Sequence, residues 1–338
     1  MAEMIFVSLV SMIFGAMGAW LVSRYAFRLG LIDIPEHRSS HTIPTPKGGG
    51  IGIVVAFVVM SIFLKISPLF WLPALGLSIL SFIGDRIDIA PAIRLMAHFV
   101  VAWIVLYYIA YNSLGFFISV TTTPYNLIII WAFLFILAAI FLVGTANFYN
   151  FMDGINGIAA LTGIVGFSLL TAYGMSNEIE SKWTLLSLSF AASCFGFLPF
   201  NYPNAKVFMG DVSSILLGFI FACLVLIMSD SLKSFMLLSS FLFPFYADEL
   251  ITMIERIKEG NSLLKPHRRH LYQVLVNEIG LAHWKVSSSY AVIQLVLGLI
   301  FWKASRIGFL WQIGALLLAG LLFIVFNNII KSRYVYSK

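Results

Sequence analysis

The chain has 338 residues, of which 60% are hydrophobic and only 11% are charged, with a mean hydropathy of +0.96 and a formal net charge of +6. A soluble globular domain carries about 25% charged residues, so this composition excludes a soluble protein and indicates a polytopic membrane protein. In such a protein the excess positive charge belongs to loops that set the topology, and we expect no nucleic-acid partner.

The apolar segments predict an all-α protein of about eleven transmembrane helices, because a span needs about 20 mostly apolar residues. In chain order they cover residues 4–26, 50–66, 68–84, 95–112, 126–145, 157–175, 183–199, 213–229, 234–252, 287–304 and 308–330. We expect residues 1–338 to form a single integral membrane domain, since no soluble domain, linker or convincing internal repeat interrupts this series.

Lysine and arginine predict the orientation of the spans, because cytoplasmic loops are enriched in both. With the N-terminus outside, five of the 21 Lys and Arg residues fall outside and the other 16 inside. The outside residues are Lys65, Lys182, Lys233, Lys303 and Arg306. The C-terminus is then cytoplasmic, with cytoplasmic loops at about 27–49, 85–94, 146–156, 200–212 and 253–286.

Five polar segments interrupt the apolar sequence, and the predicted topology places all of them on the cytoplasmic side. They are residues 33–50, 84–88, 147–157, 208–211 and 265–273. Ionisable groups close to a membrane are costly and usually mark a functional site. Segments on the same face can build one site together.

The first segment ends in PTPKGGG, where Lys47 precedes three glycines at the start of a helix. An ammonium group beside exposed backbone N–H groups is a plausible anion site. It is not a P-loop, because the GxxxxGK[ST] order is absent. The alternative is a flexible turn with a topology-setting lysine.

The second segment, GDRID, contains Asp85 and Asp88, which face the same way if the helix continues. Two carboxylates at a membrane boundary can hold Mg²⁺, which takes oxygen ligands and often shares them with substrate phosphates. The alternative is a solvated loop in which Arg86 pairs with one of the two acids.

The third segment, NFYNFMDGING, places Asn147, Asn150, Asp153 and Asn156 at intervals of three residues. On a helix or 3₁₀ turn this spacing gives a polar stripe of amide groups and one charged oxygen. The alternative is asparagine capping of the next helix, which explains one residue of the four.

The fourth segment, FMGDVSS, places Asp211 directly before a span. Asp211 is either the N-cap of that helix or a metal ligand beside a helix N-terminus that favours phosphate. Phe208 belongs either to the core or to a surface that stacks on a base.

The fifth segment contains His267, Arg268, Arg269 and His270. Arginine recognises phosphate oxygens in a bidentate way, so the segment can clamp a diphosphate. The histidines are better placed to bond phosphate than to bind Mg²⁺, which prefers oxygen. The alternative is a basic loop that contacts anionic lipid headgroups.

Taken together, these groups fit Mg²⁺-assisted phosphoryl chemistry between a lipid phosphate and a soluble diphosphate. A transporter or flippase is the main alternative, because such proteins also place charge within broken helices. The charges here lie almost wholly at span ends on one face, which favours the enzyme and also argues against a non-catalytic scaffold.

The motifs DxPxxRxxHxxPTPxGG, NxxNxxDGxNG and FMGDxxS together resemble those of the polyprenyl-phosphate N-acetylhexosamine-1-phosphate transferases (glycosyltransferase family 4). The resemblance runs from about Leu31 to Gln273. It implies transfer of an N-acetylhexosamine-1-phosphate from a UDP-sugar to undecaprenyl or another polyprenyl phosphate, with release of UMP. The ending HRRHLYQ looks most like the branch that initiates O-antigen or similar surface polysaccharides.

The resemblance also implies roles for individual residues. Asp211, with Asp153, matches the Mg²⁺ ligands, and Mn²⁺ is an expected substitute. The catalytic positions are Asp85, Asp88, Asp153, His267 and His270. The substrate-binding positions are Arg38, His41, Thr45, Lys47, Asn147, Asn150, Asn156, Phe208, Arg268 and Arg269. The resemblance further implies a bacterial cytoplasmic membrane, an active site facing the cytoplasm and, as in relatives, a homodimer.

Three positions depart from the family pattern. Gly84 stands where the family has the first Asp of an Asp-Asp pair, Asn156 where many members have Asp, and Arg269 where a histidine is usual. Because a phosphomonoester has a second pKa near 6, the nucleophile is largely ionised at pH 7 without a general base. A catalytically impaired homologue is the alternative that Gly84 leaves open.

Overall fold

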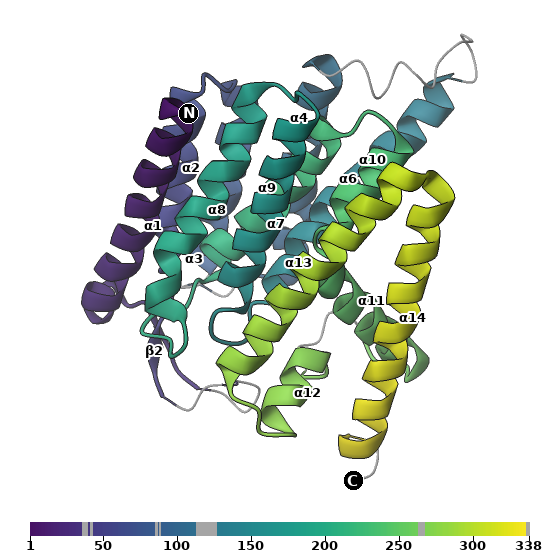
Figure 1. The fold of residues 1–338 in the computed structure, drawn as a ribbon. Coiled ribbons are helices and arrows are strands. Elements are labelled where there is room, and N and C mark those ends of the chain that lie inside the picture. The colour runs from purple at the N-terminus through teal and green to yellow at the C-terminus, as the bar shows by residue number, and fades with distance from the viewer. Residues whose placement is uncertain are drawn as a thin grey trace.

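The computed structural model describes residues 1–35, 40, 43–84, 87, 89–112, 127–262 and 268–335. The described part is almost entirely helical (Figure 1). Its helices are α1 (Ala2–Leu29), α2 (Ile51–Phe63), α3 (Pro68–Gly84), α4 (Pro91–Asn112), α6 (Leu127–Phe151), α7 (Ile158–Ser176), α8 (Ser181–Asn201), α9 (Asp211–Met228), α10 (Leu232–Ser240), α11 (Phe243–Lys258), α12 (Leu271–Asn277), α13 (His283–Ile307) and α14 (Phe309–Tyr334).

All eleven predicted segments are helical, which confirms an all-α polytopic membrane protein. Within the described residues, eight helices are long and apolar enough to cross a membrane, or nine if α10 and α11 form one broken span. The helices α2 and α3 are apolar but shorter, with 13 and 17 residues. The number of crossings therefore depends on how these two helices and the α10–α11 pair lie in the bilayer.

The prediction of one continuous helix over 234–252 is wrong. The chain bends by 86° between α10 and α11. Ser231 caps the start of α10, where its hydroxyl accepts from the Ser234 backbone N–H, and Pro244 stands in the first turn of α11. Because proline has no N–H and is tolerated only at the start of a helix, it marks a restart that the hydrophobicity pattern conceals.

Two small features, a two-stranded sheet and a short helix, were not predicted, because each is too short to give a periodic pattern. Strand β1 (Ile32–Asp33) pairs antiparallel with β2 (Thr45–Pro46), with Asp33 opposite Thr45. The other element is the seven-residue helix α12. Both belong to the polar segments, so the first and fifth polar segments have regular structure of their own.

Helix α9 forms the centre of the molecule, with almost every residue from Val212 to Met228 buried. Around it, helices approach closely where small residues meet. A Cβ atom at Gly196 of α8 would lie 2.0 Å from the Met12 carbonyl oxygen of α1, and one at Gly52 of α2 would lie 2.1 Å from that of Phe14. Close packing at glycines is typical of helix pairs in membranes.

The two termini lie at opposite ends of the bundle (Figure 1). Strand β2 and helix α12 lie at the same end as the C-terminus, away from the N-terminus. The first and fifth polar segments therefore share one end of the molecule, as a one-sided functional site requires.

Candidate functional site

The start of α9 is a meeting point for three helices. The Asp211 Oδ2 atom lies 2.5 Å from Nη2 of Arg94 on α4. Its Oδ1 atom accepts a hydrogen bond of 2.8 Å from the Asn150 side-chain amide at the end of α6. Both members of the ion pair are about 30% exposed, so this carboxylate is reachable from solvent while held by two partners.

Asp211 is not the N-cap of α9, so the capping interpretation of this residue is wrong, while its role as a metal ligand stays a prediction. It is the first helical residue, and the N-cap is Gly210, with φ 80° and no side-chain cap. The carboxylate points across to α4 and α6 instead of folding back on its own helix. Its placement fits a binding role at a helix N-terminus, where anions and metal-bound phosphates are favoured.

The polar stripe of the third segment is divided by the end of α6. Asn150 also donates to the Ser214 hydroxyl at 2.9 Å, and Asn147, one turn earlier, lies 3.2 Å from Nδ1 of His98. Asp153 and Asn156 follow after the helix has ended at Phe151. The first half of the stripe is therefore directed at α9 and α4.

The second half of the stripe is tied to the helices around it. The Asn156 backbone N–H donates to His283 Nδ1 at 3.2 Å, and its carbonyl accepts from the Ser287 hydroxyl at 2.7 Å. The N-cap of α7 is Gly157, with φ 81° and no side-chain cap, so the interpretation that an asparagine caps this helix is wrong. Asn201 accepts from the Gly157 N–H at 2.7 Å and fixes the turn.

The Lys-Gly turn, residues 45–50, docks on the segment before α9. The Phe208 N–H donates to the Pro46 carbonyl at 2.7 Å, and the Gly49 and Gly50 N–H groups donate to Phe208 and Met209 at 2.9 and 3.0 Å. A Cβ atom at Gly50 would lie 1.6 Å from the Ser213 hydroxyl oxygen. Only glycine permits this approach, which explains part of the glycine run.

Within the turn, Thr45 is buried and its hydroxyl donates to the Ile43 carbonyl at 2.8 Å. The Lys47 N–H donates to the Leu31 carbonyl at 3.0 Å, and both Lys47 and Phe208 are half-buried. The first and fourth segments thus form one surface.

The fifth segment contacts the third through Tyr272. The Tyr272 hydroxyl donates to the Phe151 carbonyl at 3.0 Å. A Cβ atom at Gly154 would lie 2.1 Å from the Tyr272 hydroxyl oxygen. Burial raises the pKa of Tyr272 well above its usual value, so the phenol remains a hydrogen-bond donor at neutral pH. Four of the five polar segments are therefore linked by direct contacts.

His270 is buried at 2% exposure and lies between two carboxylates of α11. Its Nδ1 is 3.7 Å from Asp248 and its Nε2 is 3.4 Å from Glu249. These two contacts anchor the start of α12 to α11. A direct catalytic role for His270 stays a prediction.

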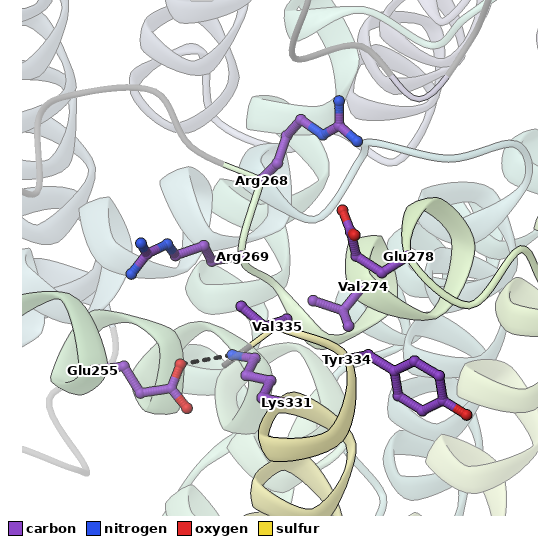
Figure 2. Close-up of a pocket in the computed structure, with 8 residues that line it drawn as sticks. All are labelled: Glu255, Arg268, Arg269, Val274, Glu278, Lys331, Tyr334 and Val335. Atoms are coloured by element: carbon purple, nitrogen blue, oxygen red, sulfur yellow. Dashed lines mark hydrogen bonds and ion pairs between the residues drawn. The ribbon is translucent and has the colours of Figure 1, made fainter. Parts of the chain in front are cut away.

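Arg268 and Arg269 line a pocket of about 130 Å³ next to Val274 of α12 (Figure 2). Arg269 pairs with Glu259, and across the pocket Lys331 donates to Glu255 at 2.7 Å. The remaining lining residues are Val274, Glu278, Tyr334 and Val335. The pocket lies between α11, α12 and the end of α14. Its lining contains both cationic and anionic side chains, including the two arginines of the predicted diphosphate clamp.

Five predicted site residues lie outside the described residues: Arg38, His41, Asp85, Asp88 and His267. Among the residues that the structure does describe, no group of three or more His, Cys, Asp or Glu side chains is arranged to hold a metal. The Mg²⁺ site therefore stays a prediction, as do the roles of the five residues.

Sequence reasoning did not select Arg94 and His98 as site residues. They stand four apart at the start of α4, so they share one face, and this face meets Asp211 and Asn147. The four-residue spacing of Arg94 and His98 and their place at the end of a span were the features of the sequence that could have identified them as site residues. Asp248 on α11 is a third residue that the sequence motifs did not select, although it stands near the end of the predicted span 234–252.

Comparison with known proteins gives a consistent result. Residues 67–229 match the profile described as "Glycosyl transferase family 4". The chain is 28% identical to decaprenyl-phosphate N-acetylglucosaminephosphotransferase of Mycobacterium leprae, covering 91% of this chain and 84% of the relative. It is 28% identical to undecaprenyl-phosphate alpha-N-acetylglucosaminyl 1-phosphate transferase of Thermotoga maritima, with 82% and 84% covered. It is 25% identical to phospho-N-acetylmuramoyl-pentapeptide-transferase of Halalkalibacterium halodurans, with 76% and 82% covered.

Proposed function

Because this chain belongs to the polyprenyl-phosphate hexosamine-1-phosphate transferase family, we propose that it transfers an N-acetylhexosamine-1-phosphate from a UDP-sugar to a polyprenyl phosphate. A phosphate oxygen of the lipid forms a bond to the β-phosphorus of the donor. The bond from that phosphorus to the bridging oxygen breaks, and UMP leaves with the electron pair. The polyprenyl-diphospho-sugar remains in the membrane.

The observation that carries this proposal is the convergence at the start of α9. Asp211 is held by Arg94 and Asn150, and the Lys-Gly turn docks on the preceding residues by three backbone hydrogen bonds. Cationic groups and a carboxylate at a helix N-terminus are what a diphosphate and its counter-ion require. Positioning and charge stabilisation do most of the work in phosphoryl transfer.

The residues present fit a magnesium ion. Asp211 and Asn150 offer oxygen ligands, and Asp153 is a partly exposed carboxylate three residues beyond Asn150. A carboxylate has about four lone-pair sites, so Asp211 retains acceptor capacity beside Arg94 and Asn150. When bound, the ion supplies charge neutralisation of the donor diphosphate. Arg94 holds the Asp211 carboxylate in place for that ion, and Mn²⁺ is the expected substitute.

We assign the remaining groups by their positions. Lys47 binds phosphate oxygens through its ammonium group, and Phe208, half-buried beside the turn, stacks on uracil. Arg268 and Arg269 approach the diphosphate from the fifth segment. Because no carboxylate at position 84 is available as a base, the lipid phosphate attacks as the dianion that predominates above pH 6.

The finer assignment rests on the branch resemblance of HRRHLYQ and on the relatives' names. We propose undecaprenyl phosphate as acceptor, a bacterial cytoplasmic membrane, and initiation of an O-antigen-like polysaccharide for lipopolysaccharide or cell-wall biogenesis. N-acetylglucosamine is the first donor sugar to test, because the relatives from Mycobacterium leprae and Thermotoga maritima are named for it. A homodimer is the expected assembly.

Transfer of label tests this function directly. Membranes containing the protein are incubated with Mg²⁺, undecaprenyl phosphate and a panel of labelled UDP-N-acetyl-sugars, and the organic phase is counted. We expect label in the lipid with one sugar, lost on adding EDTA and restored by excess Mg²⁺ or Mn²⁺. Folded protein that labels no lipid with any sugar would favour the impaired-homologue or the transporter alternative.

The topology is tested by labelling single introduced cysteines. Lys182 at the start of α8 should lie outside the cell and Lys206, before α9, inside. We expect a membrane-impermeant maleimide to label Lys182→Cys in intact cells and Lys206→Cys only after permeabilisation. The native Cys194 and Cys223 are buried and give the low background. The reverse labelling pattern would place the site on the outer face and contradict the proposal.

A further inference from the structure

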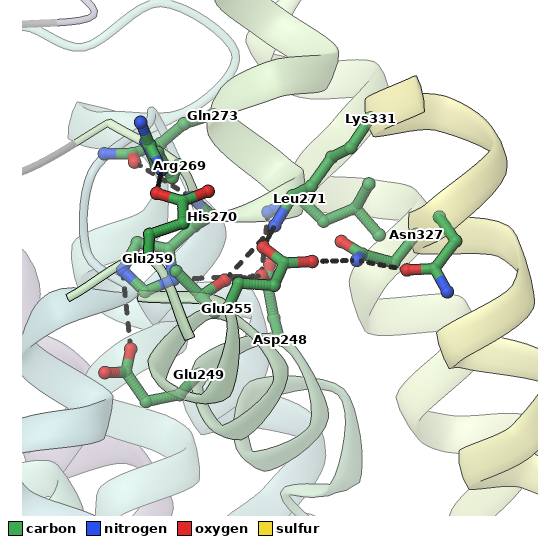
Figure 3. A network of polar contacts seen from close by, with 12 residues as sticks. Asp248, Glu249, Glu255, Glu259, Arg269, His270, Leu271, Gln273, Asn327 and Lys331 are labelled. Carbon is green, nitrogen blue, oxygen red and sulfur yellow. Dashed lines mark hydrogen bonds and ion pairs between the residues drawn. The ribbon is translucent and has the colours of Figure 1, made fainter. Parts of the chain in front are cut away.

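Asp248 is a fully buried carboxylate that takes no part in the contacts around Asp211. It lies on α11 at 1% exposure. Its Oδ1 atom accepts from the Leu271 backbone N–H at 2.7 Å, and its Oδ2 atom accepts from the Tyr272 backbone N–H at 3.2 Å. The Tyr290 hydroxyl of α13 also donates to Oδ2, at 2.7 Å. One side chain thus joins α11, the start of α12 and α13. Figure 3 shows Asp248 with Leu271 and His270 at the start of α12.

The two backbone donors explain how this carboxylate is accommodated in the interior. The first N–H groups of a helix have no acceptor within the helix, and Leu271 and Tyr272 are the first two residues of α12. Their acceptor comes from a residue more than 20 positions earlier in the chain. A buried carboxylate is tolerated only when it is hydrogen-bonded, so Asp248 and the start of α12 stabilise each other.

The same contacts lead directly to two predicted site segments. His270, immediately before α12, has its Nδ1 atom 3.7 Å from Asp248 and its Nε2 atom 3.4 Å from Glu249. Tyr272, the second residue of α12, donates from its hydroxyl to the Phe151 carbonyl at the end of α6. Asp248 therefore holds the start of α12, which belongs to the fifth polar segment and contacts Phe151, two residues before Asp153.

Helix α13 completes the arrangement from the other side. Tyr290 contacts Asp248, and one turn earlier Ser287 donates to the Asn156 carbonyl at 2.7 Å. Two sets of contacts thus fix the position of the third polar segment relative to the fifth, one through Tyr272 and one through α13. Asp248 is the acceptor common to both routes.

We propose that Asp248 is a positioning residue that sets the spacing between the Asn/Asp segment, residues 147–157, and the His/Arg segment that ends at α12. The catalytic part of this inference rests on the proposed transferase function. The structural part, that Asp248 holds the start of α12, stands independently. Misplacement of reacting groups by about 1 Å costs on the order of 100-fold in rate, so this anchor acts on turnover.

Asp248→Asn is the decisive variant. Backbone N–H groups cannot turn away, and Oδ1 and Oδ2 each accept one of them, so the amide NH₂ must face a donor in either orientation. We expect the Leu271 and Tyr272 amides to exchange hydrogen about tenfold or more faster than in wild type. We expect kcat for transfer to fall by about 100-fold, with KM for the UDP-sugar changed by less than about threefold.

Asp230→Asn is the matched control. Asp230 follows the far end of α9, and its Oδ1 atom accepts from the Ser231 and Ser234 hydroxyls, at 2.9 and 2.8 Å. Hydroxyl groups can rotate to suit an amide, so we expect unchanged kcat and unchanged exchange at α12. If Asp248→Asn fails to fold, Tyr290→Phe removes a single bond to the same oxygen and should give a smaller change in the same two measurements.

The outcomes separate the inference from the proposed function. Unchanged exchange at Leu271 and Tyr272 in folded Asp248→Asn protein would overturn the anchor. Faster exchange with unchanged kcat would overturn its role in positioning, as would a loss expressed only in KM. Wild-type protein that transfers no sugar phosphate would overturn the proposed function and the catalytic part, whereas the exchange measurement would still decide the structural part.

Discussion

Asp211→Asn is expected to reduce label transfer by about 1,000-fold or more. The carboxylate accepts from Asn150 and neutralises Arg94 at 2.5 Å. An asparagine keeps the shape but provides no negative charge, so the guanidinium loses its counter-ion and the predicted metal loses its main oxygen ligand. Its NH₂ group would also confront either Arg94 or the Asn150 amide, both of which are donors. Charge, ligand and geometry are thus lost together.

The measurement is initial transfer rate in membranes at saturating Mg²⁺, normalised to inserted protein. Asp230→Asn, the same substitution at the opposite end of α9, should transfer at the wild-type rate. Raising Mg²⁺ about tenfold should not restore Asp211→Asn, because a neutral amide is a weak ligand for a hard cation. Transfer within about tenfold of wild type would remove Asp211 from the metal site and leave it as a structural partner of Arg94.

The helix positions were predictable from the sequence because apolar length is a strong local signal. The bend between α10 and α11 was less so. Both helices are apolar enough to merge in a hydropathy pattern, while the capping by Ser231 and the placement of Pro244 act over a few residues only. The small elements β1, β2 and α12 are stabilised by contacts to distant segments and carry no periodicity of their own.

The polar segments of the site were predictable as groups, but their partners were not. The Arg94–Asp211 pair joins positions 117 residues apart, and no local pattern encodes which cation approaches which carboxylate. The two local interpretations that invoked helix capping, for Asp211 and for an asparagine before α7, are wrong because Gly210 and Gly157 occupy the cap positions with positive φ. A glycine just before each helix was the available signal.

Gly84, the departure that raised the question of activity, lies near the same cluster. An added Cβ atom there would lie 4.0 Å from Nε of Arg94 and 3.9 Å from Ile89, which is ordinary contact distance. The backbone has room for a side chain at this position, so the glycine is not required by packing. In this chain Arg94 pairs with Asp211, and a carboxylate at position 84 would compete for the same guanidinium.

Gly50→Ala is expected to lower transfer by about 100-fold, through geometry and without any change of charge. The added Cβ would lie 1.6 Å from the Ser213 Oγ and 2.6 Å from its Cβ, so the turn has to withdraw from the start of α9. The Gly50 N–H bond to Met209 then lengthens or breaks. Lys47 moves with it, away from the start of α9. The backbone at Gly50 has φ −69°, which alanine adopts readily, so the effect is steric.

Two comparisons isolate this cause. Gly76→Ala in α3 meets nothing within 4 Å of the added atom and should transfer as wild type. Ser213→Gly removes both atoms that the alanine would strike, so the double variant Gly50→Ala/Ser213→Gly should recover at least about tenfold of the loss, a coupling expected only for residues in contact. If Gly50→Ala alone transfers at the wild-type rate, the turn does not dock on α9 as described. If the double variant shows no recovery, the loss comes from Gly50 by a route other than Ser213.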